Sequence, residues 1–146
     1  MSDPLFLTEE QIIGIHAEQI RLFGGSPGLA DANLLGSAVM RPQNAYFYGG
    51  NCSLFDLAAE YAFSLGKNHA FHDGNKRVAI AAAIAFLEVN GWLVEKDLTE
   101  EMLALVTDKI TKDQFSAALQ GACKKKERKV IDLLSELQRL LGYEKS

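Results

Sequence analysis

The chain has 146 residues, of which 48% are hydrophobic, and this is enough for one compact domain with a proper core. Its formal net charge of −4 argues against a general nucleic-acid-binding protein, and its two cysteines are too few and too far apart for a disulfide framework or a zinc site. No apolar run approaches the ~20 residues that cross a bilayer, and the acidic N-terminus lacks the features of a signal peptide, so we expect a cytoplasmic protein with no membrane partner.

The first half of the chain predicts two helices followed by an irregular segment. Thr8–Gln11 forms a capping box that begins a first helix, and the glycine-rich Gly24–Gly28 ends it. Asp31 can cap a second helix, which we expect to run through Met40. Residues 41–52 lack a helical period and hold aromatic residues before a Gly-Gly pair, so we predict a loop or small hairpin there.

The helical pattern continues after this segment. Ser53 begins a helix with apolar residues at steps of three to four positions, and the Ala-rich Val78–Asn90 predicts a central helix. Thr99 and the capping box Thr111–Gln114 begin two more helices. The sequence therefore predicts an all-α domain of about six helices with a small flap or hairpin.

Residues 122–146 differ from the acidic body because they are basic and then amphipathic. We interpret Lys124–Lys129 as a solvated linker. Apolar residues at helical spacing follow it and end at Gly142, namely Val130, Leu133, Leu134, Leu137, Leu140 and Leu141. Because so short a helix is marginal alone in water, we expect its apolar stripe to be buried. The alternatives are this domain's own surface, a homodimer seam and a partner protein.

The segment His69–Arg77 carries the functional signal. A glycine that leads into a helix N-terminus is a natural anion site, because free N–H groups and the positive end of the helix dipole point there. Lys76 and Arg77 add positive charge, and Asp73 offers the hard oxygen that Mg²⁺ prefers. His69 can take a proton near neutral pH. These are the parts of a phosphoryl- or nucleotidyl-transfer site.

The order of these residues, H-x-F-x-D-G-N-K-R, resembles the signature of the Fic/Doc family, H-x-F-x-[DEN]-[AG]-N-[GK]-R, at every defined position. Phe23–Leu29 and Leu34–Val39 are similar to segments near the start of Doc-like proteins. The resemblance covers about residues 6–121. It implies that residues 1–121 form a Fic/Doc catalytic domain, to which residues 122–146 add a basic linker and an amphipathic helix.

The resemblance also implies a role for each motif residue. His69 takes the place of the base that deprotonates a target hydroxyl, and Asp73 that of the ligand of an Mg²⁺ ion bridging the phosphates of ATP. Phe71 matches a buried structural anchor. The nucleotide phosphates are expected at Gly74, Asn75, Lys76 and Arg77. The family's flap, which aligns the target by main-chain pairing, falls at residues 43–50, with target-binding residues Asn44, Ala45, Tyr46 and Phe47. Outside the motif, we expect His16 to pack or to support the site rather than to react.

Two departures from the common family pattern favour phosphate over AMP as the transferred group. Most members have Gly at position 76 and a second arginine at position 80, whereas this chain has Lys76 and Ile80. In Doc-like members that resemble this chain, the γ-phosphate is presented and the product is a phosphorylated protein. Transfer of AMP, a catalytically idle binding protein with this fold, and a DNA-binding regulator are the alternatives. Lys76 argues against the first, the intact motif against the second, and the acidic body against the third.

Control of such an enzyme is expected to come from outside the catalytic domain. No segment matches [ST]-x-x-x-E-[GN], the inhibitory helix by which many Fic proteins silence themselves. The resemblance to Doc toxins therefore implies an antitoxin acting in trans, although residues 122–146 could fill the same groove in cis. The resemblance points to elongation factor Tu as the protein substrate and to arrested translation as the outcome.

Overall fold

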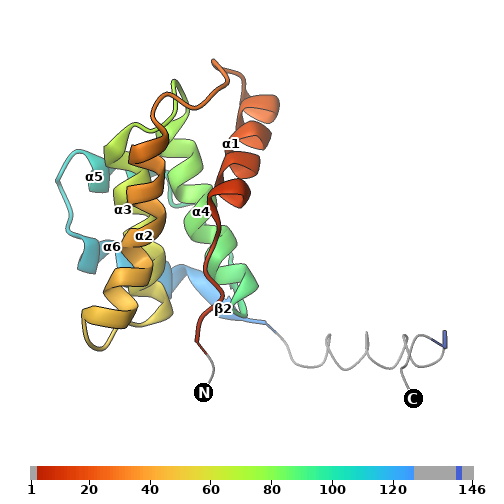
Figure 1. The fold of residues 1–146 in the computed structure, drawn as a ribbon. Coiled ribbons are helices and arrows are strands. Elements are labelled where there is room, and N and C mark those ends of the chain that lie inside the picture. Colours follow the sequence, from red (N-terminus) through yellow and green to blue (C-terminus); the bar gives the residue numbers. More distant parts are fainter. Residues whose placement is uncertain (1–2, 127–140, 143–146) are drawn as a thin grey trace.

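The computed structural model describes residues 3–126, 141 and 142, and these residues form a mostly helical fold with one two-stranded sheet (Figure 1). The prediction of an all-α domain with a small hairpin is confirmed for this part of the chain. No helix within it is long and apolar enough to span a membrane. The elements are α1 (Glu9–Phe23), α2 (Ala32–Tyr48), α3 (Leu54–Asn68), α4 (Asn75–Val89), β1 (Trp92–Val94), α5 (Thr99–Val106), α6 (Lys112–Ala122) and β2 (Cys123–Lys125).

Hydrogen bonds at the N-termini of α1, α2, α3 and α6 confirm the predicted starts of these helices, whereas α4 begins at Asn75, three residues before the predicted Val78. The Thr8 hydroxyl accepts from the Gln11 N–H at 3.1 Å, and the Gln11 side chain accepts in return from the Thr8 N–H at 2.8 Å. The same reciprocal pair joins Ser53 to Asp56 at the start of α3. The Asp31 carboxylate accepts two N–H groups from the first turn of α2. Each cap satisfies donors that have no partner inside the helix.

The predicted loop or hairpin at residues 41–52 is wrong up to Tyr48, because α2 continues through this segment. Pro42 lies inside the helix, where it removes one backbone hydrogen bond at a cost of about 3 kcal/mol. Burial of the proline ring and packing of the Phe6 ring against Tyr46 (5.9 Å between centroids) and Phe47 (6.2 Å) offset that cost.

The flap expected at residues 43–50 is therefore corrected as well. Asn44, Ala45, Tyr46 and Phe47 are helical, and the Ala45 carbonyl accepts from the Gly49 N–H at 3.0 Å. Main-chain groups that form helix hydrogen bonds are not available to pair with an extended target segment. The side chains of Asn44 and Phe47 are exposed on the helix surface instead.

The sheet lies elsewhere and includes part of the predicted linker. β2 pairs antiparallel with β1, with Trp92 opposite Lys125 and Val94 opposite Cys123. The chain that follows α6 thus completes the ladder that β1 would otherwise leave open. The Lys126 N–H donates to the Gly91 carbonyl at 2.9 Å, and Lys126 is the last residue of the continuous described range. The predicted C-terminal helix lies outside them except for Leu141 and Gly142, and the division at residues 121 and 122 stays a prediction.

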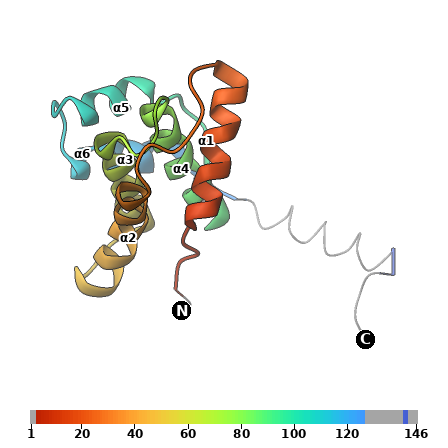
Figure 2. The same cartoon turned by 45° about the horizontal axis from the view of Figure 1, so that its top comes forward.

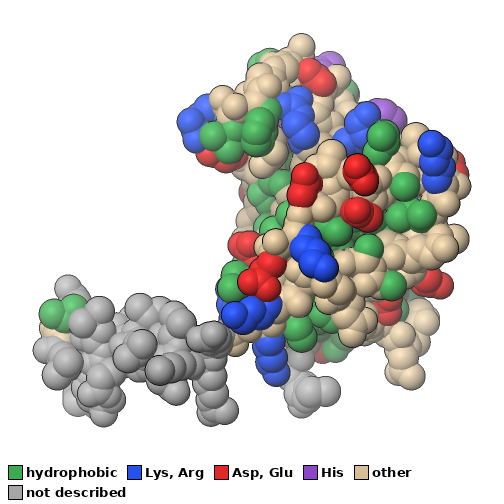
Figure 3. Space-filling model, turned by 180° about the vertical axis from the view of Figure 1, so that it is seen from behind, with side chains coloured by type: hydrophobic (Ala, Val, Ile, Leu, Met, Phe, Trp, Pro, Cys, Tyr) green, Lys and Arg blue, Asp and Glu red, His purple; other side chains and the backbone are tan. Residues whose placement is uncertain are grey.

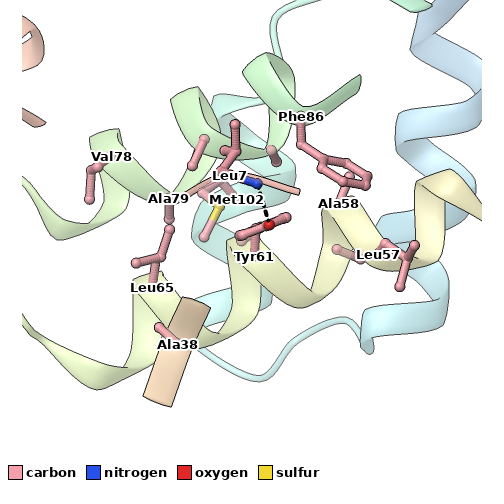
Figure 4. Close-up of a cluster of buried hydrophobic side chains, with 14 of the residues drawn as sticks. Leu7, Ala38, Leu57, Ala58, Tyr61, Leu65, Val78, Ala79, Phe86 and Met102 are labelled. Carbon is pink, nitrogen blue, oxygen red and sulfur yellow. Dashed lines mark hydrogen bonds between the residues drawn. The ribbon is translucent and has the colours of Figure 1, made fainter. Parts of the chain in front are cut away.

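The core lies where α3 and α4 pack against each other, with the other helices around them (Figures 1 and 2). Alanines on α4 let the two helices approach closely, and larger side chains fill the space on either side (Figure 4). Tyr61 is fully buried beside Phe86, and its hydroxyl accepts from the Leu7 N–H at 2.9 Å. Burial raises the pKa of Tyr61 to about 12. This contact ties the segment before α1 to the centre of the domain.

A close approach at Gly66 places α5 beside the end of α3. A Cβ atom at this position would lie 2.7 Å from the Val106 side chain and 2.8 Å from that of Met102. Only glycine therefore fits between α3 and α5 here. The contact brings α5 next to the segment that follows α3, which is the motif segment.

Candidate active site

The motif residues line one cavity of about 430 Å³ between the end of α3 and the start of α4. The structure brings together six of the predicted site residues there, namely His69, Asp73, Gly74, Asn75, Lys76 and Arg77. Phe71 is buried beneath the loop, as expected of an anchor. The residues predicted as a flap, 44–47, do not line this cavity. Sequence reasoning missed Gly66, Lys67 and Val106, which also line it.

Both ends of the motif loop have left-handed backbone conformations. His69 is the C-cap of α3, with φ 54° and ψ 47°, a conformation that costs a non-glycine residue about 1–2 kcal/mol. Gly74 is the N-cap of α4, with φ 75°, and a Cβ atom there would lie 3.2 Å from the Arg77 guanidinium. The turn at His69 leaves its imidazole exposed at the cavity. Strain of this kind commonly accompanies a functional position.

The side chain of Asn75 brackets the backbone of Phe71. Its amide oxygen accepts from the Phe71 N–H at 3.1 Å, and its amide nitrogen donates to the Phe71 carbonyl at 2.9 Å. Both residues are buried. The amide therefore fixes the loop onto the first turn of α4. Because its oxygen and nitrogen are both occupied in this way, a phosphate here would be bound by the free backbone N–H groups at the start of the helix.

The glycine-rich segment after α1 forms a second support for the loop. The Ser26 N–H donates to the Asp73 carboxylate at 3.1 Å, and the Gly24 carbonyl accepts from the Arg77 guanidinium at 2.8 Å. Gly25 has φ 117°, and a Cβ atom there would lie 2.6 Å from the Asp73 carboxylate. The sequence marked this segment only as a helix stop and a point of family resemblance, but it holds two of the charged site residues.

His16, on α1, supports the loop from below, in agreement with the packing or supporting role expected of it. It is 3% exposed, and its ring stacks on Phe71 with 3.9 Å between centroids. Its Nε2 lies 2.7 Å from the Asp73 carbonyl oxygen. Because a carbonyl oxygen only accepts, Nε2 carries a proton, which fixes the tautomer if the ring is neutral.

Hydrogen-bond donors and the positively charged Arg77 surround the Asp73 carboxylate. Hydrogen bonds from the N–H groups of Ser26 and Gly74 hold the pKa of the Asp73 carboxyl below its usual value, and Arg77, at 3.9 Å, lowers it further. The carboxylate is therefore ionised at neutral pH. Because the pKa of the Asp73 carboxyl is lower in the folded chain than in the unfolded chain, the hydrogen bonds to its carboxylate stabilise the fold at pH values above the ordinary pKa. This stabilisation is lost as the pH falls through the folded-state pKa.

The described residues contain no group of three or more His, Cys, Asp or Glu side chains that could hold a metal ion by itself. A hard cation such as Mg²⁺ is commonly bound through one or two carboxylates, water and substrate phosphates, and the Asp73 carboxylate is a ligand of that kind. Asp73 is about half exposed at the cavity and is the carboxylate that lines it.

Comparison with known proteins identifies the family. The model of the Fic/DOC family matches residues 6–87, which hold α1, α2, α3, the whole motif loop and most of α4. The chain belongs to the Fic/DOC family. The resemblance inferred from the motif is thereby confirmed.

Two curated relatives are similar over most of their length, and both are Doc proteins. "Toxin Doc" of Mycolicibacterium smegmatis is 41% identical over 106 residues, which cover 68% of this chain and 81% of that protein. "Protein kinase doc" of Escherichia phage P1 is 33% identical over 85 residues, which cover 58% of this chain and 68% of that protein. Within the Fic/DOC family, this chain is thus similar to Doc toxins.

The two positions that depart from the common Fic/DOC pattern lie in different places. Lys76 is exposed and lines the main cavity. Ile80 is one turn further along α4 and lines an adjoining hollow of about 280 Å³ between α4 and α5. Lys76 and Arg77 line both spaces. At position 80 the chain therefore presents an apolar surface where a second arginine would place a charge.

Proposed function

We propose that this Fic/DOC protein is a Doc-like toxin that transfers the γ-phosphate of ATP to a Ser or Thr hydroxyl of a target protein. The observation that carries the proposal is the meeting of His69, Asp73 and the N-terminus of α4 in one cavity. A base, a carboxylate for a hard cation and a helix end for phosphate are the three parts that this chemistry needs. The phage P1 relative is named a protein kinase, which agrees with transfer of a phosphate group to a protein.

In the proposed reaction, His69 accepts the proton of the target hydroxyl. The hydroxyl oxygen forms a bond to the γ-phosphorus while the bond from that phosphorus to the β–γ bridging oxygen breaks, so that ADP leaves. The N–H groups at the start of α4, with Lys76 and Arg77, stabilise the charge that develops on the transferred group and on ADP. Asp73 would hold Mg²⁺, which neutralises charge on the phosphates when it is bound.

Replacing Asp73 with asparagine should raise the Mg²⁺ concentration needed for half-maximal transfer by at least about tenfold, because loss of even an outer-shell partner of a metal site typically lowers the metal affinity by about 10–100-fold. The measurement is a magnesium titration of transfer, with Asp31→Asn, a helix cap outside the cavity, as the matched control. An unchanged magnesium dependence in Asp73→Asn would remove this carboxylate from the metal site.

The choice of phosphate over AMP should depend on Lys76 and Ile80. We expect the double variant Lys76→Gly/Ile80→Arg, which restores the common family pattern, to transfer label from the α-phosphate of ATP to the target. Each single variant, made as a control, should give less α-label than the pair. If the double variant still transfers only γ-label, then these two positions do not select the transferred group.

The proposal extends to a target and a partner. Elongation factor Tu is the proposed substrate, and an antitoxin acting in trans is the proposed partner of this cytoplasmic toxin. Induced expression in bacterial cells should then stop growth and amino-acid incorporation, and elongation factor Tu from those cells should carry phosphate on Ser or Thr. Arrested cells with unmodified elongation factor Tu would exclude it as the target.

A further inference from the structure

Lys67 lines the active-site cavity but has no part in the reaction as proposed so far. It lies in the last turn of α3, two residues before His69. Among the described residues that line the cavity, Lys67, Lys76 and Arg77 are cationic, and Asp73 is acidic. Figure 3 shows histidine side chains next to Lys and Arg side chains in the upper part of the face that it presents. This excess of positive charge suits a polyphosphate.

The charge of Arg77 is partly used within the motif loop. Its guanidinium donates to the Gly24 carbonyl at 2.8 Å and lies 3.9 Å from the Asp73 carboxylate. A polyphosphate in the cavity therefore receives less neutralisation from Arg77 than a free guanidinium would give. A further cation on the α3 side of the cavity would add what is missing.

The close approach of α5 at Gly66 fixes the backbone of the next residue, Lys67. The last turn of α3 is held against Val106, the final residue of α5, and Val106 also lines the cavity. The backbone of Lys67 is thus placed by packing. Its side chain is a flexible stem whose ammonium can point in more than one direction.

The Lys67 ammonium is held by Asp108, which follows α5. It donates to both oxygens of the Asp108 carboxylate, at 2.7 Å each. Asp108 does not line the cavity, and its side chain is 73% exposed, compared with 29% for Lys67. An ion pair with so exposed a partner is weak, because water screens it. A phosphate that enters the cavity can therefore compete with Asp108 for the ammonium.

Asp108 occupies a backbone position that more often holds glycine. Its φ is 60°, and its N–H donates to the Leu105 carbonyl at 3.3 Å. The Lys109 N–H donates to the Ala104 carbonyl at 2.8 Å, which completes the pattern of a Schellman C-cap. Aspartate is tolerated in this left-handed conformation, but glycine adopts it more readily. What aspartate adds here is the carboxylate that pairs with Lys67.

We propose that Lys67 binds a phosphate of the nucleotide, and that Asp108 holds the Lys67 ammonium until the nucleotide enters. The inference rests on the proposed function, because that function makes ATP the ligand of the cavity. On binding, the ammonium exchanges the carboxylate oxygens for a phosphate oxygen. The rival explanation is that Lys67 and Asp108 only tie α3 to α5.

Replacing each partner in the full chain separates phosphate binding from a structural tie. Lys67→Met should lower the affinity for ATP with Mg²⁺ by at least about tenfold, the effect of losing one hydrogen bond to a charged group. Asp108→Asn breaks the same ion pair, keeps a residue that tolerates the left-handed backbone and frees the ammonium. It should bind ATP at least as tightly as the unmodified chain. Titration calorimetry measures the affinities, and a thermal melt checks the fold.

Equal losses of ATP affinity in the two variants would show a structural tie and would overturn the proposal. An affinity of Lys67→Met within about threefold of the unmodified chain would also overturn it. Failure of the unmodified chain to bind ATP would instead remove the proposed function itself. The two kinds of failure are therefore distinguishable.

Inorganic tripolyphosphate and adenosine identify the part of the nucleotide that Lys67 contacts. Lys67→Met should lose affinity for tripolyphosphate and keep its affinity for adenosine. Lys67→Arg, which keeps the charge, should stay within about threefold of the unmodified chain for ATP. Lys109→Met removes an exposed charge beside Asp108 but outside the cavity, and it should leave ATP affinity unchanged. An equal loss of adenosine affinity in Lys67→Met would mean that Lys67 only maintains the shape of the cavity.

Discussion

Replacing His69 with alanine should lower the rate of transfer by about 10²–10⁴-fold, the range that a positioned general base contributes. The chain should remain folded and should still bind ATP, because the imidazole is exposed at the cavity and is not part of the core. Initial rates with a labelled nucleotide, a binding titration and a thermal melt measure the three quantities on one protein preparation.

His72 provides the matched control for this prediction. It is also an exposed histidine that lines the same cavity, but it lies on the other side of Phe71 in the loop. We expect His72→Ala to keep the rate within about tenfold of the unmodified chain. Similar losses in the two variants would mean that the cavity needs positive or aromatic groups in general, and His69 would lose its place as the base.

Replacing Asn75 with alanine should destabilise the domain by about 2–4 kcal/mol. The change leaves the N–H and the carbonyl of buried Phe71 without their partners, and an unsatisfied buried group costs about 1–3 kcal/mol. Urea unfolding followed by circular dichroism measures the free energy of unfolding. Lys76→Ala, at the next position of α4 but exposed, should change it by less than about 0.5 kcal/mol.

The same pair of variants separates a positioning role from direct phosphate binding by the amide. If Asn75→Ala binds ATP weakly while its free energy of unfolding stays unchanged, the amide contacts nucleotide and the bracket around Phe71 contributes little. We expect instead that Asn75→Ala lowers the free energy of unfolding, and that its nucleotide affinity falls only because the loop is held less firmly.

Elements fixed by local sequence were predictable, and those fixed by distant packing were not. The capping boxes at Thr8 and Ser53 are complete within four residues, so the helix starts could be placed from sequence. The end of α2 could not, because Pro42 and the aromatic residues after it are helical only through packing against Phe6. β2 likewise depends on β1, which lies about thirty residues earlier.

The candidate site also has parts that could be predicted from local sequence and parts that depend on distant contacts. The motif residues are close in sequence and carry a recognisable pattern, so the sequence was enough to predict that His69, Asp73 and the start of α4 meet in one site. The supports of Asp73 are His16 and Ser26, which lie 57 and 47 residues away in the chain. His16 had one available signal, because it falls one helical turn after Ile12 on the buried face of α1. Ser26 lies in a segment that the sequence marked only as a helix stop and a point of family resemblance, and this gave no sign of a contact with Asp73.

The most direct test of γ-phosphate transfer is parallel labelling of a bacterial lysate. The chain and its His69→Ala variant are incubated with Mg²⁺ and ATP labelled at either the α- or the γ-phosphate, and labelled proteins are compared. The proposed function predicts a protein band that carries γ-label alone and is absent with His69→Ala. A His69-dependent band with α-label would contradict it and would make this Fic/DOC protein an AMP transferase.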